Sequence, residues 1–188
     1  MFWRILATTA CVLVLASCQQ QPAGPSTVRS ATAPTAAAVQ HEQDVPFAGA
    51  ATGVAIYDPS NPKGCAAVPG QPFAITTRSE GTGNALHMGA VDFDAGHCQT
   101  PQGMVGDAVV TAADGDKIYV TYVAHREGTG PLVVGGYIYL HGSMTFSGGT
   151  GRFENASGTA EMTGAVLWEG FADLESPGEW HWEGRISY

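Results

Sequence analysis

The sequence predicts an all-β domain, most simply an eight-stranded antiparallel barrel, and two observations lead to this fold class. Residues 47–188 contain 24 of the 25 glycines. Each glycine inside a helix costs about 1 kcal/mol relative to alanine, so helices of ordinary length have almost no place to form. Apolar and polar side chains also alternate with a period of two, which is typical of strands with one buried face. A closed barrel leaves no strand edge exposed, and a β-sandwich is the alternative architecture.

Eight strands are expected, and their order follows the chain. They begin near Thr52, Phe73, Asn84, Asp107, Lys117, Leu132, Gly158 and Glu179. The alternation is clear in the fifth strand, where Ile118, Val120 and Tyr122 share one face, and it recurs over residues 136–146, 161–169 and 179–188. Asp114-Gly115 predicts a hairpin turn between the strands near residues 107–112 and 117–124.

The same alternation predicts which side chains face the barrel interior. In the last strand, Trp180, Trp182 and Ile186 are expected inside, whereas Glu179, His181 and Glu183 are expected outside. The candidate residues for lining a cavity are Tyr122, Trp168, Trp180, Trp182 and His87. His87 shares a face with Val91 and Phe93, which makes it the one histidine expected to point inward, either as a hydrogen-bonded core residue or as a catalytic group.

The first 17 residues have the layout of a signal peptide. A short apolar run follows Arg4 and is too short to cross a bilayer core of about 30 Å. The run ends in Leu15-Ala16-Ser17-Cys18, which resembles the lipobox of bacterial lipoproteins. That resemblance implies cleavage before Cys18 and a diacylglycerol on its sulfur, and Gln19 in the next position implies an outer-membrane destination. A plain secretory signal with an incidental Cys18 is the alternative.

The segment after the cleavage site is predicted to be a flexible tether over residues 18–46. From Gln19 to Pro46, 20 of 28 residues are Gln, Ala, Pro, Thr or Ser, and none is aromatic. Such a composition cannot bury a core. The chain is therefore divided into a signal peptide (1–17), a tether (18–46) and a β-barrel domain (47–188). The formal net charge of -9, with only two lysines, excludes a nucleic-acid partner.

The four cysteines predict one disulfide. Cys11 lies in the signal peptide and Cys18 is the expected lipid attachment site, which leaves Cys65 and Cys98 for the domain. An even pair in an exported protein is typical of a disulfide. A metal site with His87 and His97 is the alternative, but it lacks the short paired spacings of zinc sites. We expect no metal and no cofactor.

One motif resembles a known superfamily. Residues 148–160, Gly-Gly-Thr-Gly-Arg-Phe-Glu-Asn-Ala-Ser-Gly-Thr-Ala, resemble the Gly-Gly-Thr-Gly-x-Phe-x-x-Ala-x-Gly-x-Ala signature of the dirigent and allene oxide cyclase superfamily. Residues 83–89 and 112–116 also resemble segments that recur in bacterial members of that group. The resemblance implies an eight-stranded barrel and a homotrimer. It transfers no catalytic residue to this chain.

The function expected from the sequence is that of a cell-envelope lipoprotein, anchored to the lipid bilayer through Cys18. Its barrel would bind a small apolar ligand or a protein partner, and an outer stripe of Tyr119, Tyr137 and Tyr139 favours a protein contact. One alternative, which the superfamily resemblance implies, is an isomerase or cyclase with His87 as general base. The other is a purely structural surface protein with a filled barrel.

Overall fold

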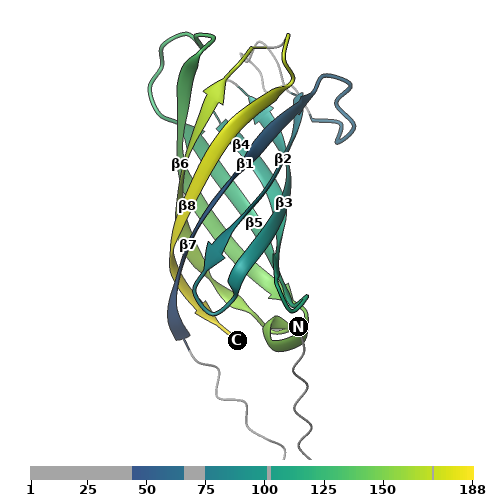
Figure 1. The fold of residues 1–188 in the computed structure, drawn as a ribbon, viewed down its shortest axis with the longest axis vertical. Coiled ribbons are helices and arrows are strands. Elements are labelled where there is room, and N and C mark those ends of the chain that lie inside the picture. Colours follow the sequence, from purple (N-terminus) through teal and green to yellow (C-terminus); the bar gives the residue numbers. More distant parts are fainter. Residues whose placement is uncertain (1–43, 66–74, 101–102, 171) are drawn as a thin grey trace, which may run out of the picture. The chain divides into compact units, whose positions relative to one another are not determined.

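The computed structural model describes residues 44–65, 75–100, 103–170 and 172–188, and they form one closed antiparallel barrel (Figure 1). The barrel contains β1 (Asp44–Asp58), β2 (Ile75–Ala85), β3 (Gly89–Thr100), β4 (Gly103–Ala112), β5 (Lys117–Arg126), β6 (Gly136–Gly149), β7 (Ser157–Trp168) and β8 (Glu175–Ser187). Each strand pairs with its sequence neighbours, and β1 pairs with β8 from Asp44 to Ile56. The predicted eight-stranded barrel is therefore confirmed, and the β-sandwich is excluded.

The predicted signal peptide, the lipid attachment site at Cys18 and the tether up to residue 43 lie outside the described residues. Residues 44–46 were expected in the tether but already belong to β1, so the barrel begins earlier than predicted. The composition hides this start, because Pro46 is an unusual strand residue. Its carbonyl lies beyond the end of the β1–β2 pairing and accepts a hydrogen bond from His87 Nε2 at 2.9 Å. No helix in the described part of the chain is long and apolar enough to span a membrane.

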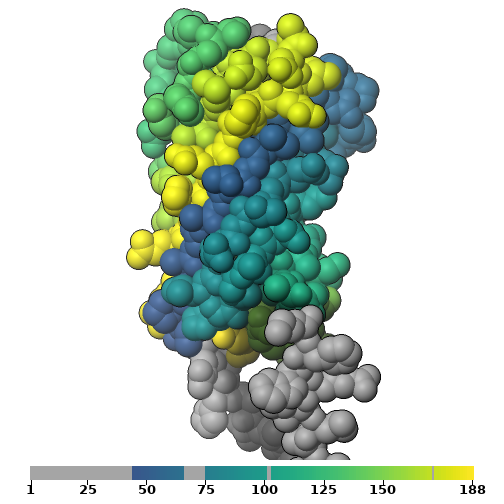
Figure 2. Space-filling view, in the orientation of Figure 1, coloured from purple at the N-terminus to yellow at the C-terminus, as the bar shows by residue number. Residues whose placement is uncertain are grey.

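The inward and outward faces follow the predicted alternation. In β8, Trp180, Trp182 and Ile186 are buried, and the residues between them are exposed or half-buried. The strands β5 and β6 alternate in the same way over their whole lengths. On the face formed by β8, β1 and β2, the side chains close the wall of the barrel (Figure 2).

Aromatic side chains fill one end of the barrel, which is the lower end in Figure 1. Phe153, in the short 3₁₀ helix η1 (Gly151–Phe153), is fully buried, and its ring centroid lies 4.8 Å from that of Tyr188. Phe47 and Phe146 meet edge to face at 5.0 Å. This end is therefore plugged by packed rings.

Residues 148–151, which begin the motif that resembles the superfamily signature, form a turn that contacts the β4–β5 connection. The backbone N–H of Lys117 donates to Thr150 Oγ1 at 3.0 Å. Arg152 forms ion pairs with Asp114 and Asp116 of the β4–β5 turn. Gly151 has a φ of 58° and lies against the Asp116 carboxylate, where a side chain would collide. The motif thus fastens the β6–β7 connection to the β4–β5 turn.

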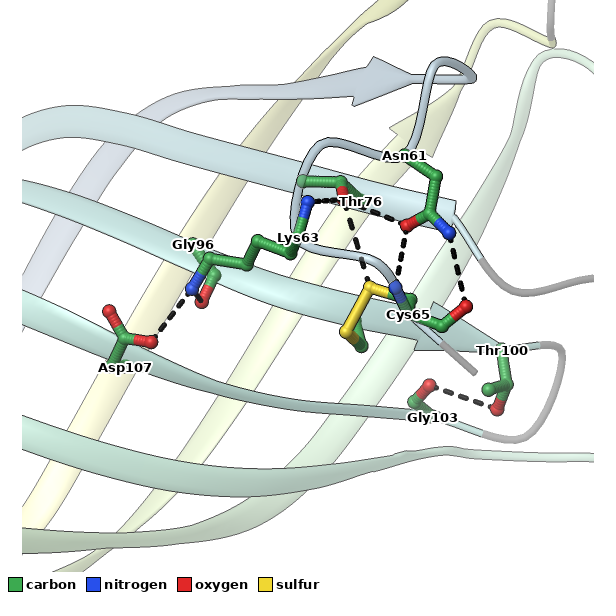
Figure 3. The surroundings of a disulfide bond; sticks show 9 residues. Asn61, Lys63, Cys65, Thr76, Gly96, Thr100, Gly103 and Asp107 are labelled. Carbon is green, nitrogen blue, oxygen red and sulfur yellow. Dashed lines mark hydrogen bonds and ion pairs between the residues drawn. A yellow bond between two sulfur atoms is a disulfide. The ribbon is translucent and has the colours of Figure 1, made fainter. Parts of the chain in front are cut away.

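At the other end, the segment after β1 folds over the outer face of β2 and β3. Cys65 and Cys98 form a disulfide with a Cα–Cα distance of 5.4 Å, which confirms the prediction from the even pair of cysteines in the domain. Figure 3 shows Lys63 extended across the wall, with its Nζ donating to Gly96 O at 2.9 Å and to Asp107 at 2.7 Å. Asn61 accepts hydrogen bonds from Thr76 Oγ1 and from the backbone N–H of Cys65. We call residues 59–65 the clasp.

Candidate functional site

The barrel encloses a cavity of about 60 Å³ with mostly apolar walls. Tyr122, Trp180 and Trp182 line it, as predicted. Trp168 does not, because its ring packs edge to face on Tyr57 at 5.0 Å instead. The walls also include Phe93, Val110 and His97, and six small or flexible side chains: Ser79, Ala95, Ala108, Met104, Met144 and Met162. Three methionines around one cavity make its shape adaptable, since the unbranched thioether chain changes rotamer easily.

The prediction that His87 points into the barrel is wrong. The strand expected from Asn84 onward is interrupted, because Ala85–Met88 form a turn in which Met88 N–H donates to Ala85 O at 3.2 Å. His87 lies in this turn with a φ of 67°, and its side chain is exposed. It therefore neither lines the cavity nor can act there as a base.

The buried histidine is His97, which the sequence analysis considered only as a metal ligand. It is 2% exposed, and its Nδ1 lies 2.7 Å from the Tyr122 hydroxyl. The alternation contained the signal, because residues 91, 93, 95 and 97 share the inner face of β3. His97 and Tyr122 are separated by β4, and both are in register with Gly106 there. A side chain at Gly106 would approach His97 Cβ to 2.5 Å, so this glycine lets the two rings meet.

Both members of this pair are electrically neutral near neutral pH. Burial lowers the pKa of His97 to about 4, and the Gln99 side chain opposes this shift only in part. Burial also raises the pKa of Tyr122, with a smaller contribution from the negative charge of Asp107. His97 Nε2 is buried and has no hydrogen-bond partner among the described residues. The pair can therefore donate or accept one further hydrogen bond inside the barrel, but it carries no charge.

Further polar groups share this layer of the interior. Thr77 is in register with Tyr57 on one side and His97 on the other. Thr77 Oγ1 is buried without a partner among the described residues. Burial raises the pKa of Tyr57, and a hydrogen bond with Ser176 opposes the shift. The interior is therefore less uniformly apolar than the alternation suggested.

Exposed apolar side chains gather on one outer face. Nine large hydrophobic side chains are exposed in the described part of the chain, and seven of them lie on β4, β5, β6 or the β5–β6 loop. We call these seven the contact face: Val105, Tyr119, Val123, Val133, Val134, Tyr137 and Tyr139. Val105 and Val123 are direct register partners, and the rings of Tyr137 and Tyr139 stack at 6.0 Å. The predicted tyrosine stripe therefore shares this side of the barrel with four exposed valines.

Three exposed aspartates of the barrel form ion pairs. Asp94 pairs with Arg78, Asp107 with Lys63, and Asp114 with Arg152. Within residues 44–65, 75–100, 103–170 and 172–188, no three His, Cys, Asp or Glu side chains gather closely enough to hold a metal ion.

Comparisons with known proteins add little to this geometry. No protein-family model matches the chain, and no curated protein matches it. Among solved structures, the chain is similar to a pterocarpan synthase dirigent protein, with 15% identity, a TM-score of 0.33, and coverage of 78% of this chain and 86% of that one. At this TM-score the likeness carries no argument about activity, and the strand pairing is what establishes the barrel.

Proposed function

We propose that this chain is a lipid-anchored protein of the cell envelope whose barrel is a non-enzymatic binding module. In this proposal the barrel binds a protein partner through the contact face. The observation that carries the proposal is the clustering of seven of the nine exposed large hydrophobic side chains on three adjoining strands and one loop. Exposed apolar side chains gathered on one side of a barrel are typical of protein interfaces, including those in which polar residues, here Thr121, His125 and His141, lie among them.

The chemistry of the contact face suits protein recognition. Tyr137 and Tyr139 are 59% and 53% exposed and present two stacked rings with hydroxyl groups at their tips. Tyrosine is enriched at interfaces because it buries a large apolar area and still satisfies a polar group. Burying a valine is worth about 1.5–3 kcal/mol, so Val105 and Val123 add a driving force beside the rings.

The interior gives less support to catalysis. Pockets for drug-sized ligands are about 300–1,000 Å³ in volume, whereas this cavity has about 60 Å³. A general base should have a pKa near the working pH, and burial holds the pKa of His97 at about 4. An isomerase or cyclase would therefore have little space for substrate and a weak base beside it.

A second copy of the chain is the first candidate for the partner, in line with the trimer that the superfamily resemblance implies. Light scattering coupled to size exclusion should find an oligomer for the mature chain carrying Cys18→Ser. The double variant Tyr137→Ser, Tyr139→Ser should shift the mass toward the monomer. Leu86→Ser is the matched control, because Leu86 is 51% exposed but lies in the β2–β3 turn, away from the contact face. A wild-type chain that is monomeric at every concentration would exclude self-association.

The anchor is proposed from the lipobox resemblance and needs its own test. Mass spectrometry of the mature protein should find residues 1–17 absent and acyl mass on Cys18. The Cys18→Ser variant should move from the outer-membrane fraction to the soluble fraction. A wild-type chain that is soluble and unacylated would refute the anchor while leaving the contact-face proposal open.

A small neutral ligand in the barrel is the second candidate function. The unpartnered His97 Nε2 beside a methionine-lined cavity favours it. Native mass spectrometry of protein taken from its own membrane is the test. A retained mass that disappears in the His97→Gln variant would support a ligand role, and an empty barrel would leave the contact face as the functional surface.

A further inference from the structure

Two histidines lie side by side on the outer wall of the barrel. His125 of β5 and His141 of β6 are direct register partners, and both side chains are exposed. Their ring centroids are 6.5 Å apart, with the rings tilted by 41°. Neither ring has a hydrogen bond to another group of the described part of the chain.

Their position in the sheet is that of a chelating pair. Directly opposite residues of an antiparallel pair have Cβ atoms about 4.5–5.5 Å apart. Two imidazoles that start at this separation can converge on one ion by rotation of the side chains, because both side chains are exposed. The strands on both sides are held by continuous pairing, with β4 against β5 and β7 against β6. The folded backbone therefore already holds the two histidines together, and metal binding requires ordering of their side chains only.

We propose that His125 and His141 bind one divalent transition-metal ion of the copper, nickel or zinc class through one nitrogen each. Imidazole is a preferred ligand of these ions, with metal–nitrogen distances of about 2.0–2.1 Å for zinc, and affinity rises from nickel to copper. Within the described residues no group of three His, Cys, Asp or Glu side chains could hold a metal ion, and in this proposal water fills the remaining coordination positions. This makes the site an exchangeable one on the surface and not a structural metal centre.

The electrostatic surroundings favour a cation. The chain has a formal net charge of -9. Glu127 follows His125 by two residues, and its backbone N–H donates to Tyr139 O, which keeps it on the same stretch of wall. Glu161 of β7 is paired with Ser143 of β6, two residues from His141, so Glu161 lies diagonally opposite His141 on the neighbouring strand. Arg126, which lies between His125 and Glu127 and donates to Gly130 O, offsets part of this negative charge, and the two carboxylates together still leave an excess of negative charge that attracts divalent ions.

His181 provides an internal comparison. It lies in the same outward row, because His141 is in register with Thr163, and Thr163 with His181. One whole strand therefore separates His181 from His141, and no histidine faces it directly. A site that depends on paired imidazoles should include His125 and His141 and omit His181.

The test uses the purified mature chain carrying Cys18→Ser and the ions alone, Cu²⁺, Ni²⁺ and Zn²⁺, in isothermal titration. We expect one ion per chain, with Cu²⁺ binding most tightly, and a loss of affinity of at least about tenfold in His125→Gln and in His141→Gln, because loss of a group that merely hydrogen-bonds to a ligand already costs about 10–100-fold. His181→Gln should bind like the wild type. Electron paramagnetic resonance of the Cu²⁺ form should report two coordinating nitrogens that become one in either single variant.

Three results would overturn the site. They are the absence of binding, an equal loss in His181→Gln, and an unchanged copper spectrum in His125→Gln. Paramagnetic broadening in the wild-type chain gives a measurement that needs no variant, since Cu²⁺ should broaden the resonances of β5 and β6 near these residues and spare those around His181. His125 and His141 lie between Val123 and Tyr139 of the contact face, so the titration is repeated with the Tyr137→Ser, Tyr139→Ser variant, and failure of metal binding in both proteins overturns the site while leaving the contact-face proposal intact.

Discussion

Removal of the disulfide should lower the free energy of unfolding by about 3.7 kcal/mol, because the unfolded chain regains the conformational entropy of the loop that the bond closes. Cys65 and Cys98 are 33 residues apart. In the chain-entropy model a loop of this length removes about 12.5 cal/mol/K from the unfolded ensemble, which is about 3.7 kcal/mol at 25 °C. The double variant Cys65→Ser, Cys98→Ser should therefore lose about that much stability and melt roughly 10 °C lower.

Urea unfolding of wild type and double variant, followed by tryptophan fluorescence, measures this difference. Lys63→Ala is the matched control, because Lys63 lies in the same clasp but its side chain makes only exposed contacts, an ion pair with Asp107 and a hydrogen bond to Gly96 O, and exposed ion pairs are worth about 0–1 kcal/mol. A loss below about 1 kcal/mol in the double variant would refute the reasoning. It would mean that the bonds of Asn61 to Thr76 and Cys65 already hold the clasp in place without the covalent link.

Three further predictions concern the plug and the buried pair. Phe153→Ala should cost about 3–5 kcal/mol in urea unfolding, because the ring is fully buried at the lower end, while Arg152→Ala should cost no more than about 1 kcal/mol. Gly106→Ala should cost about 1–3 kcal/mol and shift the His97 ring resonances, since its methyl group would meet His97 Cβ at 2.5 Å; unchanged resonances would contradict the role given to this glycine. Because the pKa of His97 is about 4 when folded and 6.5 ordinarily, the unfolded chain binds more protons between these values, so stability should fall by up to about 3 kcal/mol as the pH drops from 6.5 to 4. His97→Gln should remove that part of the pH dependence, and equal slopes for the two proteins would refute it.

The alternation of side chains is enough to predict the barrel, because β5, β6 and β8 each have one buried and one exposed face. It placed Trp180, Trp182 and Ile186 inside correctly. It failed for His87, since a period of two applies only while the chain stays extended, and the turn at Ala85–Met88 breaks the count. A non-glycine residue with a φ of 67° is uncommon, and the residues around His87 do not indicate a left-handed backbone conformation at this position.

Trp168 shows a second limit of the same reasoning. It is buried, as predicted, but burial does not say at which height along the barrel a side chain lies. The register pairs Trp168 with Gly136, at the end of the β6–β7 ladder, and its ring packs on Tyr57 there instead of lining the cavity. Height in a barrel depends on the stagger of all the strands, which no single segment determines.

Register is also what creates the buried pair and the surface pair, and this explains why neither could be predicted. His97 reaches Tyr122 only because Gly106 lies between them in both ladders. A shift of one residue in either ladder would place another side chain between the two rings. His125 faces His141 only because the β5–β6 loop sets that alignment, and a shift of one residue there would pair each histidine with an inward-facing neighbour. The side-chain alternation in the sequence determines which face of each strand is buried, whereas the buried pair and the surface pair depend on which residues of neighbouring strands lie opposite each other. Substitutions at Gly106 and at His125 therefore test the strand register as well as the proposed roles of these residues.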